Sequence, residues 1–293
     1  MNWLIITSTD TDIKEKIIAC DPSAKFFCHS VDSSFENFFT LNESLESVTH
    51  CIALFNKSYT YDTACVFMLG YLIGKGIPVY TTKKASSSYI PRNVCSFESE
   101  EELITFVISN YNEIHNQYKK ERARNYLFEK GFAFTEDGFS FCVSNGMLDA
   151  CKQYVAGGIN VNVKNWKGIP LLNTAIRKEK LEIARYLIEN GADVNAISLD
   201  RGYSALMDAV WCGSEDGVRL LLDNGAKLNI INKDGQTMLI LAVGAGRTEI
   251  CKMLVESGED PDIKDRMGMS AYEYARLFKK DDIADILEKF HKK

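Results

Sequence analysis

Proline and histidine are scarce in this chain of 293 residues, with five and four copies, and neither half is dominated by one sign of charge. Residues 1–134 carry 13 Lys and Arg against 16 Asp and Glu, and residues 135–293 carry 21 against 24, so each part is near −3. A protein that binds nucleic acid usually presents a basic face or arm. We therefore expect no nucleic-acid partner.

Long hydrophobic runs are also missing. No stretch approaches the ~20 apolar residues that a membrane-spanning helix needs. The apolar residues 1–7 lack the basic flank of a signal peptide and predict a strand instead. Hydrophobic residues make up 46% of the sequence and charged residues 25%, which is typical of globular proteins. Length and composition predict two domains in a soluble, cytoplasmic protein that has no membrane association.

The nine cysteines match no disulfide framework or metal-binding pattern. Their number is odd, no Cys-x-x-Cys occurs, and most of them lie within apolar runs. The four histidines do not lie at ligand spacing with them, as a zinc site would require. We expect reduced thiols, no metal and no cofactor.

The second half of the chain repeats itself every 33 or 34 residues. Three residue types recur in register: Gly158, Gly191, Gly225 and Gly258; Ala175, Ala209, Ala242 and Ala275; Leu187, Leu221, Leu254 and Leu287. In one unit, Gly191 can end a leucine-rich helix in the left-handed conformation, and Ser204 can cap the next helix. Residues 215–224 predict a second helix with one apolar face. Such short pairs cannot bury their apolar faces alone, so we expect them to stack.

This repeat resembles the ankyrin repeat, whose pattern runs Gly-x-Thr-Pro-Leu-His-x-Ala, then Leu-Leu, then Gly-Ala-Asp-Val-Asn. The best matches lie at 202–209, 235–242, 191–195 and 220–222, whereas no unit keeps Thr-Pro-Leu-His intact. The resemblance predicts that residues 135–293 form an all-α ankyrin repeat solenoid of about five units, with divergent end units as caps. It also implies a protein partner, bound by the hairpin tips and the concave face of the inner helices.

Four residues are candidates for contact with that partner. Trp166 is expected at a hairpin tip and Trp211 just after an inner helix, with Arg177 and Arg201 nearby. Tryptophan and arginine are enriched among the residues that dominate binding energy at interfaces. The alternative is that each tryptophan packs against an adjacent turn or against the other domain.

Residues 1–112 predict an α/β domain. Short apolar runs bounded by turn residues predict strands at 3–7, 25–29, 51–55 and 78–82, and helical patterns occupy 12–18, 38–48 and 64–75. This alternation favours a parallel sheet covered on both faces, with a ligand site at the carboxyl ends of the strands. A glutamate-rich segment from Glu98 opens a long helical pattern, and residues 113–134 are expected to form a helical linker.

One segment of this domain carries a motif that starts after the third strand and ends in the fourth. Its residues are Asp62, Leu69, Gly70, Tyr71, Lys75, Pro78 and Val79. They resemble the signature of the nucleoside 2-deoxyribosyltransferase family, Asp-x-Gly-Thr-x-x-Glu-[Leu/Ile]-Gly-[Tyr/Phe]-Ala followed by Gly-Lys-Pro-Val. The resemblance implies a parallel-sheet domain with a pocket for a nucleotide-like small molecule.

The motif departs from the family at its chemical centre. The family's nucleophilic glutamate is replaced by Met68, whose thioether has no anionic oxygen and cannot form a glycosyl ester. Asn42 stands at the place of an earlier family acid, and Cys65 replaces a threonine. Asp62 keeps the acid that contacts the sugar in the family. We therefore expect Asn42, Asp62, Cys65 and Met68 as ligand-binding candidates and no catalytic residue.

Two classes of function stay open. The first is a non-enzymatic interaction protein, in which the ankyrin array docks a partner beside a degenerate, nucleotide-binding-like domain. The second is an active nucleoside or nucleotide N-glycosyl hydrolase or deoxyribosyltransferase that the repeats target. Met68 favours the first class.

Overall fold

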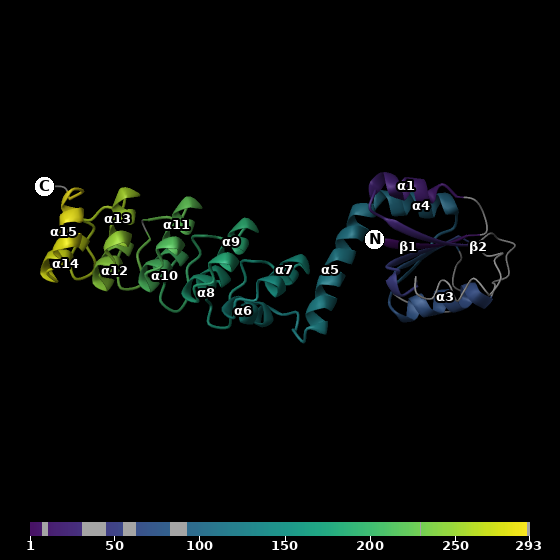
Figure 1. Ribbon diagram of the computed structural model, residues 1–293, viewed down its shortest axis with the longest axis horizontal. Helices are drawn as coiled ribbons and strands as arrows, with labels where there is room; N and C mark the ends of the chain where they lie inside the picture. Colours follow the sequence, from purple (N-terminus) through teal and green to yellow (C-terminus); the bar gives the residue numbers. More distant parts are fainter. Residues whose placement is uncertain (8–10, 31–44, 55–62, 83–92, 229, 292–293) are drawn as a thin grey trace. The chain divides into compact units, whose positions relative to one another are not determined.

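The computed structural model describes residues 1–7, 11–30, 45–54, 63–82, 93–228 and 230–291. The chain divides into two compact units, Met1–Lys119 and Lys120–Lys293. The division falls within helix α5, Tyr111–Glu129, inside the segment predicted as a linker (Figure 1).

The first unit is built on a five-stranded sheet whose strands are all parallel. Its order is β2-β1-β3-β4-β5, with strands at Asn2–Thr7 (β1), Lys25–Ser30 (β2), His50–Leu54 (β3), Val79–Thr81 (β4) and Val94–Ser96 (β5). In the register, Ile5 of β1 lies between Cys28 of β2 and Ile52 of β3. The predicted parallel sheet is confirmed, with one additional strand, β5, that the sequence did not indicate.

Two apolar layers cover the two faces of this sheet (Figure 1). Helices α1 (Ile13–Cys20) and α4 (Glu100–Ser109) pack on one face, and α3 (Thr63–Gly74) packs on the other. Successive side chains of a strand point to opposite faces, so β1 places Trp3 and Ile5 in the first layer, and Leu4 and Ile6 in the second. Both layers are therefore built from one apolar run.

The structure divides one predicted helix of this unit and describes only part of another. The pattern that starts at Glu98 is not continuous, because it breaks at Asn110 into α4 and α5. The hydroxyl of Ser99 starts α4 by accepting the Glu102 N–H. The helix predicted at 38–48 lies mostly outside the described residues, although residues 45–47 are helical.

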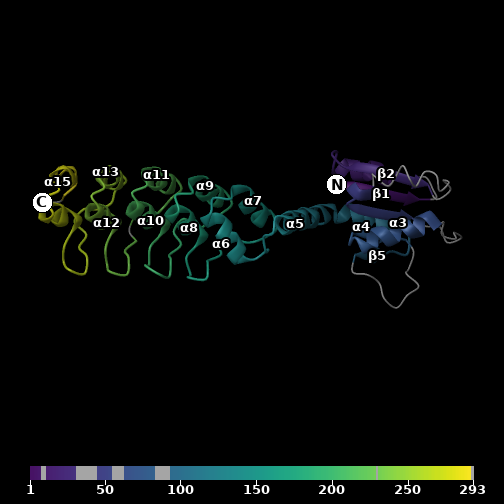
Figure 2. The same ribbon diagram turned by 60° about the horizontal axis from the view of Figure 1, so that its bottom comes forward.

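The second unit is a stack of helix pairs, and its described residues contain five of them (Figures 1 and 2). The pairs are α6 (Glu136–Ser144) with α7 (Leu148–Ala156), α8 (Leu171–Arg177) with α9 (Leu181–Glu189), α10 (Ala205–Cys212) with α11 (Glu215–Asp223), α12 (Met238–Ala245) with α13 (Thr248–Glu256), and α14 (Ala271–Leu277) with α15 (Asp281–Glu288). The sequence predicts about five such units over residues 135–293.

The periodic residues take the places that the repeat assigns to them. The recurring alanines and leucines from Ala175 to Leu287 are fully buried between units. Gly191, Gly225 and Gly258 have positive φ angles of 87°, 81° and 99°, a conformation that costs other residues energy. Each glycine therefore turns the chain out of an outer helix.

The last pair closes the stack. In α12 and α13, Leu239, Ile240, Val243 and Val255 are buried. One repeat later, the corresponding residues are Tyr272, Glu273, Arg276 and Glu288, and none of them is buried. A polar outer face is typical of the terminal repeat of such a stack.

A buried carboxylate starts helix α12. Glu259 stands where other units carry alanine, as at Ala192, and only 5% of it is exposed. Its Oε1 accepts the backbone N–H of Leu239 at 2.9 Å, whereas Oε2 has no hydrogen-bond partner among the described residues. Burial raises the pKa of Glu259 to about 7, and the hydrogen bonds offset only part of that effect.

Because the folded state binds the Glu259 proton more tightly than the unfolded chain does, this group should make the repeats more stable in mild acid. Its contribution is complete below its unfolded pKa and is lost as pH rises through about 7. Between pH 5 and pH 8, we expect the free energy of unfolding of the native protein to fall by roughly 2 kcal/mol more than that of the Glu259→Gln variant. Urea unfolding at several pH values measures this, and parallel pH profiles of the two proteins would contradict it.

Candidate functional site

The inner helices align one position of every repeat along the stack. On neighbouring helices α6, α8, α10, α12 and α14 this position holds Ser144, Arg177, Trp211, Gly244 and Leu277. Trp211 is 50% exposed and Leu277 is 62% exposed, whereas the recurring alanines of the same helices are fully buried. Two of the five inner helices, α10 and α14, thus present a large apolar side chain to solvent at this position.

A groove lies at the start of the stack, between α6, α8 and the loop that joins the first pair to the second. Its volume is about 530 Å³. Helix α6 supplies Phe141 and Ser144, the loop supplies Trp166 and Lys167, and the end of α8 supplies Arg177 and the next residue, Lys178. Trp166 is 80% exposed and Phe141 is 54% exposed, so two aromatic rings border the groove.

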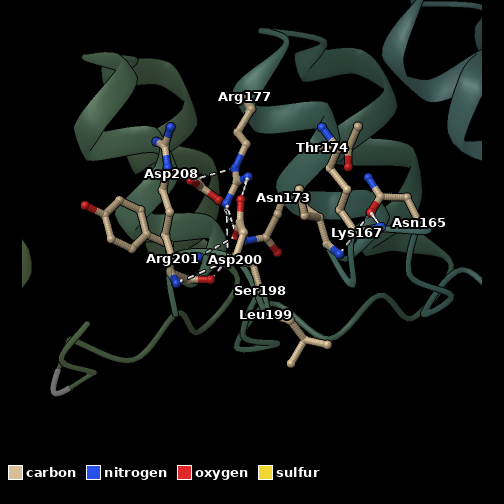
Figure 3. A network of polar contacts seen from close by, with 12 residues as sticks. Asn165, Lys167, Asn173, Thr174, Arg177, Ser198, Leu199, Asp200, Arg201 and Asp208 are labelled. Atoms are coloured by element: carbon tan, nitrogen blue, oxygen red, sulfur yellow. Dashed lines mark hydrogen bonds and ion pairs between the residues drawn. The ribbon is translucent and has the colours of Figure 1, made fainter. Parts of the chain in front are cut away.

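Arg177 is held in place by two carboxylates of the third repeat (Figure 3). Its Nη1 and Nη2 donate to Oδ2 and Oδ1 of Asp200 at 2.6 and 3.1 Å. Its Nε lies 2.8 Å from Oδ1 of Asp208 in a second ion pair. This arrangement fixes the guanidinium on three sides and joins α8 to α10 and to the loop before it.

Asp208 is the most costly member of this network, because only 1% of it is exposed. Burial raises the pKa of Asp208, and the Arg177 guanidinium acts against that effect. The amide of Asn173 donates to Asp208 Oδ2 at 2.8 Å and to the Tyr203 carbonyl at 3.1 Å. Hydrogen bonds from Arg177 hold the pKa of Asp200 well below its usual range. A single cation therefore pairs with both carboxylates, but it offsets only part of the cost of burying Asp208.

The side chains of the other candidates on the repeats lie outside this network, although the backbone N–H of Arg201 donates to Asp200 Oδ1 at 2.7 Å. The guanidinium of Arg201 is exposed and lies 5.9 Å from the centre of the Tyr203 ring. Trp166 carries the ammonium of Lys167 over its ring at 4.7 Å. The sequence interpretation missed Phe141 and Asp208. Asp208 had a usable signal, since it is the one charged residue in the otherwise apolar helix 205–212.

The candidates in the first unit are only partly described. Asn42 and Asp62 lie outside the described residues, and Cys65 belongs to α3 but its side chain is not described. Met68 of α3 is fully buried, in the apolar layer that contains Leu4 and Val79. Its thioether is therefore shielded from solvent and belongs to the packing of α3 on the sheet.

Two sites considered from the sequence can be addressed in the described residues. No group of His, Cys, Asp or Glu side chains there has an arrangement that could hold a metal ion. No disulfide joins the cysteines whose side chains the structure describes. Within the same part of the chain, no helix is both long enough and apolar enough to cross a membrane.

The network around Arg177 leads to a test of stability. Replacing Arg177 by alanine leaves Asp208 buried without its cation, so we expect a loss of about 3 kcal/mol or more in the free energy of unfolding of the repeats. The Arg201→Ala variant is a matched control, because this exposed guanidinium should contribute less than about 1 kcal/mol. Urea unfolding followed by Trp211 fluorescence measures both. Equal stabilities of the two variants would show that the buried pair has no such role.

Comparison with known proteins agrees with this architecture. The family model "Ankyrin repeats (3 copies)" matches residues 139–232, and "Ankyrin repeats (many copies)" matches residues 221–275. Shorter alignments show similarity to a B-cell lymphoma 3 protein homolog of Mus musculus and to protein PhlB of Serratia liquefaciens. They are 34% and 38% identical over 109 and 101 residues. These matches cover 37% and 34% of this chain but only 24% and 44% of those proteins.

A longer match covers most of the chain. An ankyrin repeat-containing protein of Treponema pallidum (strain Nichols) is 33% identical over 237 residues, which is 80% of this chain and 80% of that protein. The second unit, Lys120–Lys293, is too short to supply 237 residues, so the similarity extends into the first unit. On the strength of this match and of the repeats themselves, the chain belongs to the ankyrin repeat-containing proteins.

Proposed function

We propose that this protein is an interaction module whose repeats dock another protein through the inner helices and the adjoining loops. The observation that carries the proposal is the exposure of Trp166 and Trp211 on one side of a stack whose apolar core is closed. Isolated exposed apolar residues are ordinary, but large aromatics that line a groove and an inner-helix row are typical of interfaces.

The geometry suggests different roles for the four partner-contact candidates. Trp166 and Trp211 offer broad apolar surfaces to a partner, and Arg201 offers an exposed guanidinium. Arg177 borders the same groove, but Asp200 and Asp208 engage its guanidinium. We assign Arg177 the role of holding the loop and the two inner helices in one geometry, which reduces the ordering cost of binding.

For the first unit we propose a catalytically silent relative of the nucleoside 2-deoxyribosyltransferases that holds a nucleotide-like ligand or acts as a scaffold. The five-stranded parallel sheet and the position of residues 69–79, at the turn from α3 to β4, support the resemblance. The burial of Met68 supports the absence of glycosyl transfer, since the side chain at the nucleophile position packs in an apolar layer. The eight cysteines whose side chains the structure describes form no disulfide, which is consistent with work in the reducing cytoplasm.

The alternative is an active N-glycosyl hydrolase or deoxyribosyltransferase that the repeats target. Such an enzyme would need another carboxylate, and Asp62 is the family acid that remains. Release of free base from a panel of nucleosides, nucleotides and NAD separates the two proposals. We expect no release by the native protein. Base release that is abolished in the Asp62→Ala variant would establish the enzyme.

Partner binding should depend on Trp211. We expect the Trp211→Ala variant to bind a partner about 30-fold more weakly, or worse, because truncating an aromatic anchor costs about 2 kcal/mol or more. The partner is identified by photo-crosslinking from position 211, and affinity is measured by calorimetry. Phe128→Ala is the matched control, since Phe128 is 82% exposed but lies on α5. Equal affinity of both variants would place the interface elsewhere.

Introducing the family carboxylate at position 68 should damage the fold instead of creating an enzyme. In the Met68→Glu variant, a carboxylate would enter an apolar layer without partners, so we expect the first unit to lose several kcal/mol of stability and to release no base. Met68→Leu is the control, with a cost below about 1.5 kcal/mol. Denaturation followed by Trp3 fluorescence and chromatography of free base measure the two effects. A folded Met68→Glu variant that releases base would show that position 68 reaches a pocket.

A further inference from the structure

We infer that the groove between α6 and α8 binds a short acidic segment of the partner protein, anchored by an aromatic or aliphatic side chain between Phe141 and Trp166. This inference rests on the proposed interaction function and names the chemistry of the partner.

The anchor follows from the two aromatic rings. Phe141 of α6 and Trp166 of the adjoining loop both line the groove, and both are more than half exposed. Burying two such rings against one apolar side chain removes apolar surface from water, which favours binding. The chain itself leaves this surface uncovered, in contrast with the closed layers inside the repeats.

Three polar side chains that line the groove form hydrogen bonds within the protein. The Ser144 hydroxyl donates to the Ser140 carbonyl, and the Thr174 hydroxyl donates to the Pro170 carbonyl. The side-chain oxygen of Asn165 accepts the N–H groups of Lys167 and Ile169. These groups already form hydrogen bonds within the protein. We therefore expect the charged side chains at the rim of the groove to select the partner.

That rim favours a negatively charged occupant. Three cations line the groove, Lys167, Arg177 and Lys178, against one carboxylate, Asp137. Asp200 and Asp208 of the third repeat more than offset the charge of Arg177, so the attraction rests on the exposed ammonium groups of Lys167 and Lys178, which outnumber Asp137 in the groove. Charge complementarity of this kind directs the encounter and disfavours partners of the wrong sign.

The position of Lys167 strengthens this preference. Its ammonium lies 4.7 Å from the centre of the Trp166 ring and already occupies one cation site on that aromatic face. A cationic side chain from a partner would meet this charge, whereas a carboxylate would pair with it. An acidic residue beside the anchor therefore satisfies the ring and the ammonium together.

The test selects ligands from a phage-displayed library of random peptides against the full-length chain. We expect enrichment of peptides that combine acidic residues with one aromatic or aliphatic residue. The Lys167→Glu/Lys178→Glu double variant should bind them at least about tenfold more weakly, with a smaller difference at high salt. The control is Lys152→Glu/Lys252→Glu, which places the same charge change on exposed positions of the outer helices α7 and α13.

Fluorine NMR of the protein labelled with fluorotryptophan locates the bound peptides, since the chain has three tryptophans. The Trp166 signal should shift, and that of the fully buried Trp3 should not. Neutral or basic peptides, or equal binding to both double variants, would overturn the inference. Peptides that shift only Trp211 would refute the acidic groove but leave the interaction function standing. Peptides that shift neither exposed tryptophan, or no enrichment at all, would count against both.

Discussion

The second unit depends on the burial of short apolar faces between neighbouring helix pairs. The helices of these pairs, α6 to α15, run for only seven to nine residues, which is too few for a helix to be stable alone in water. Each gains its stability by packing on the next pair, with alanines such as Ala209 allowing close approach and leucines such as Leu221 filling the space between outer helices. Because this constraint acts at every junction, it imposes the repeat on the sequence and leaves the rest of the surface free to vary.

Polar groups enter this stack at a few buried places, and each has a definite structural consequence. Glu259 accepts the backbone N–H of Leu239 in the first turn of α12. Arg177 joins the second and third repeats through an ion pair with Asp208 and charge-assisted hydrogen bonds to Asp200. Such bonds depend on direction, unlike apolar contacts, so they define how neighbouring repeats sit. The groove beside Arg177 inherits that fixed geometry.

The first unit obeys another constraint, since a parallel sheet must be covered on both faces. Helix α3 contributes Met68 and Leu72 to one covering layer, and α1 and α4 cover the other face. Met68 therefore contributes to the packing of α3 on the sheet. The similarity to the Treponema pallidum protein extends into this unit, so its pairing with ankyrin repeats is not confined to this chain.

The repeats and the parallel sheet could be predicted from the sequence, because both follow from local patterns. Glycine, alanine and leucine recur at one period in the repeats, and brief apolar runs alternate with helical segments in the first unit. The sequence did not indicate β5, since a strand of three residues leaves almost no pattern. The contacts between side chains that are distant in the sequence depend on the tertiary structure. Arg177 and Asp208 lie 31 positions apart, and Phe141 and Trp166 lie on different elements. Stacking brings these residues together, and no spacing along the chain encodes the distance between side chains on adjacent repeats.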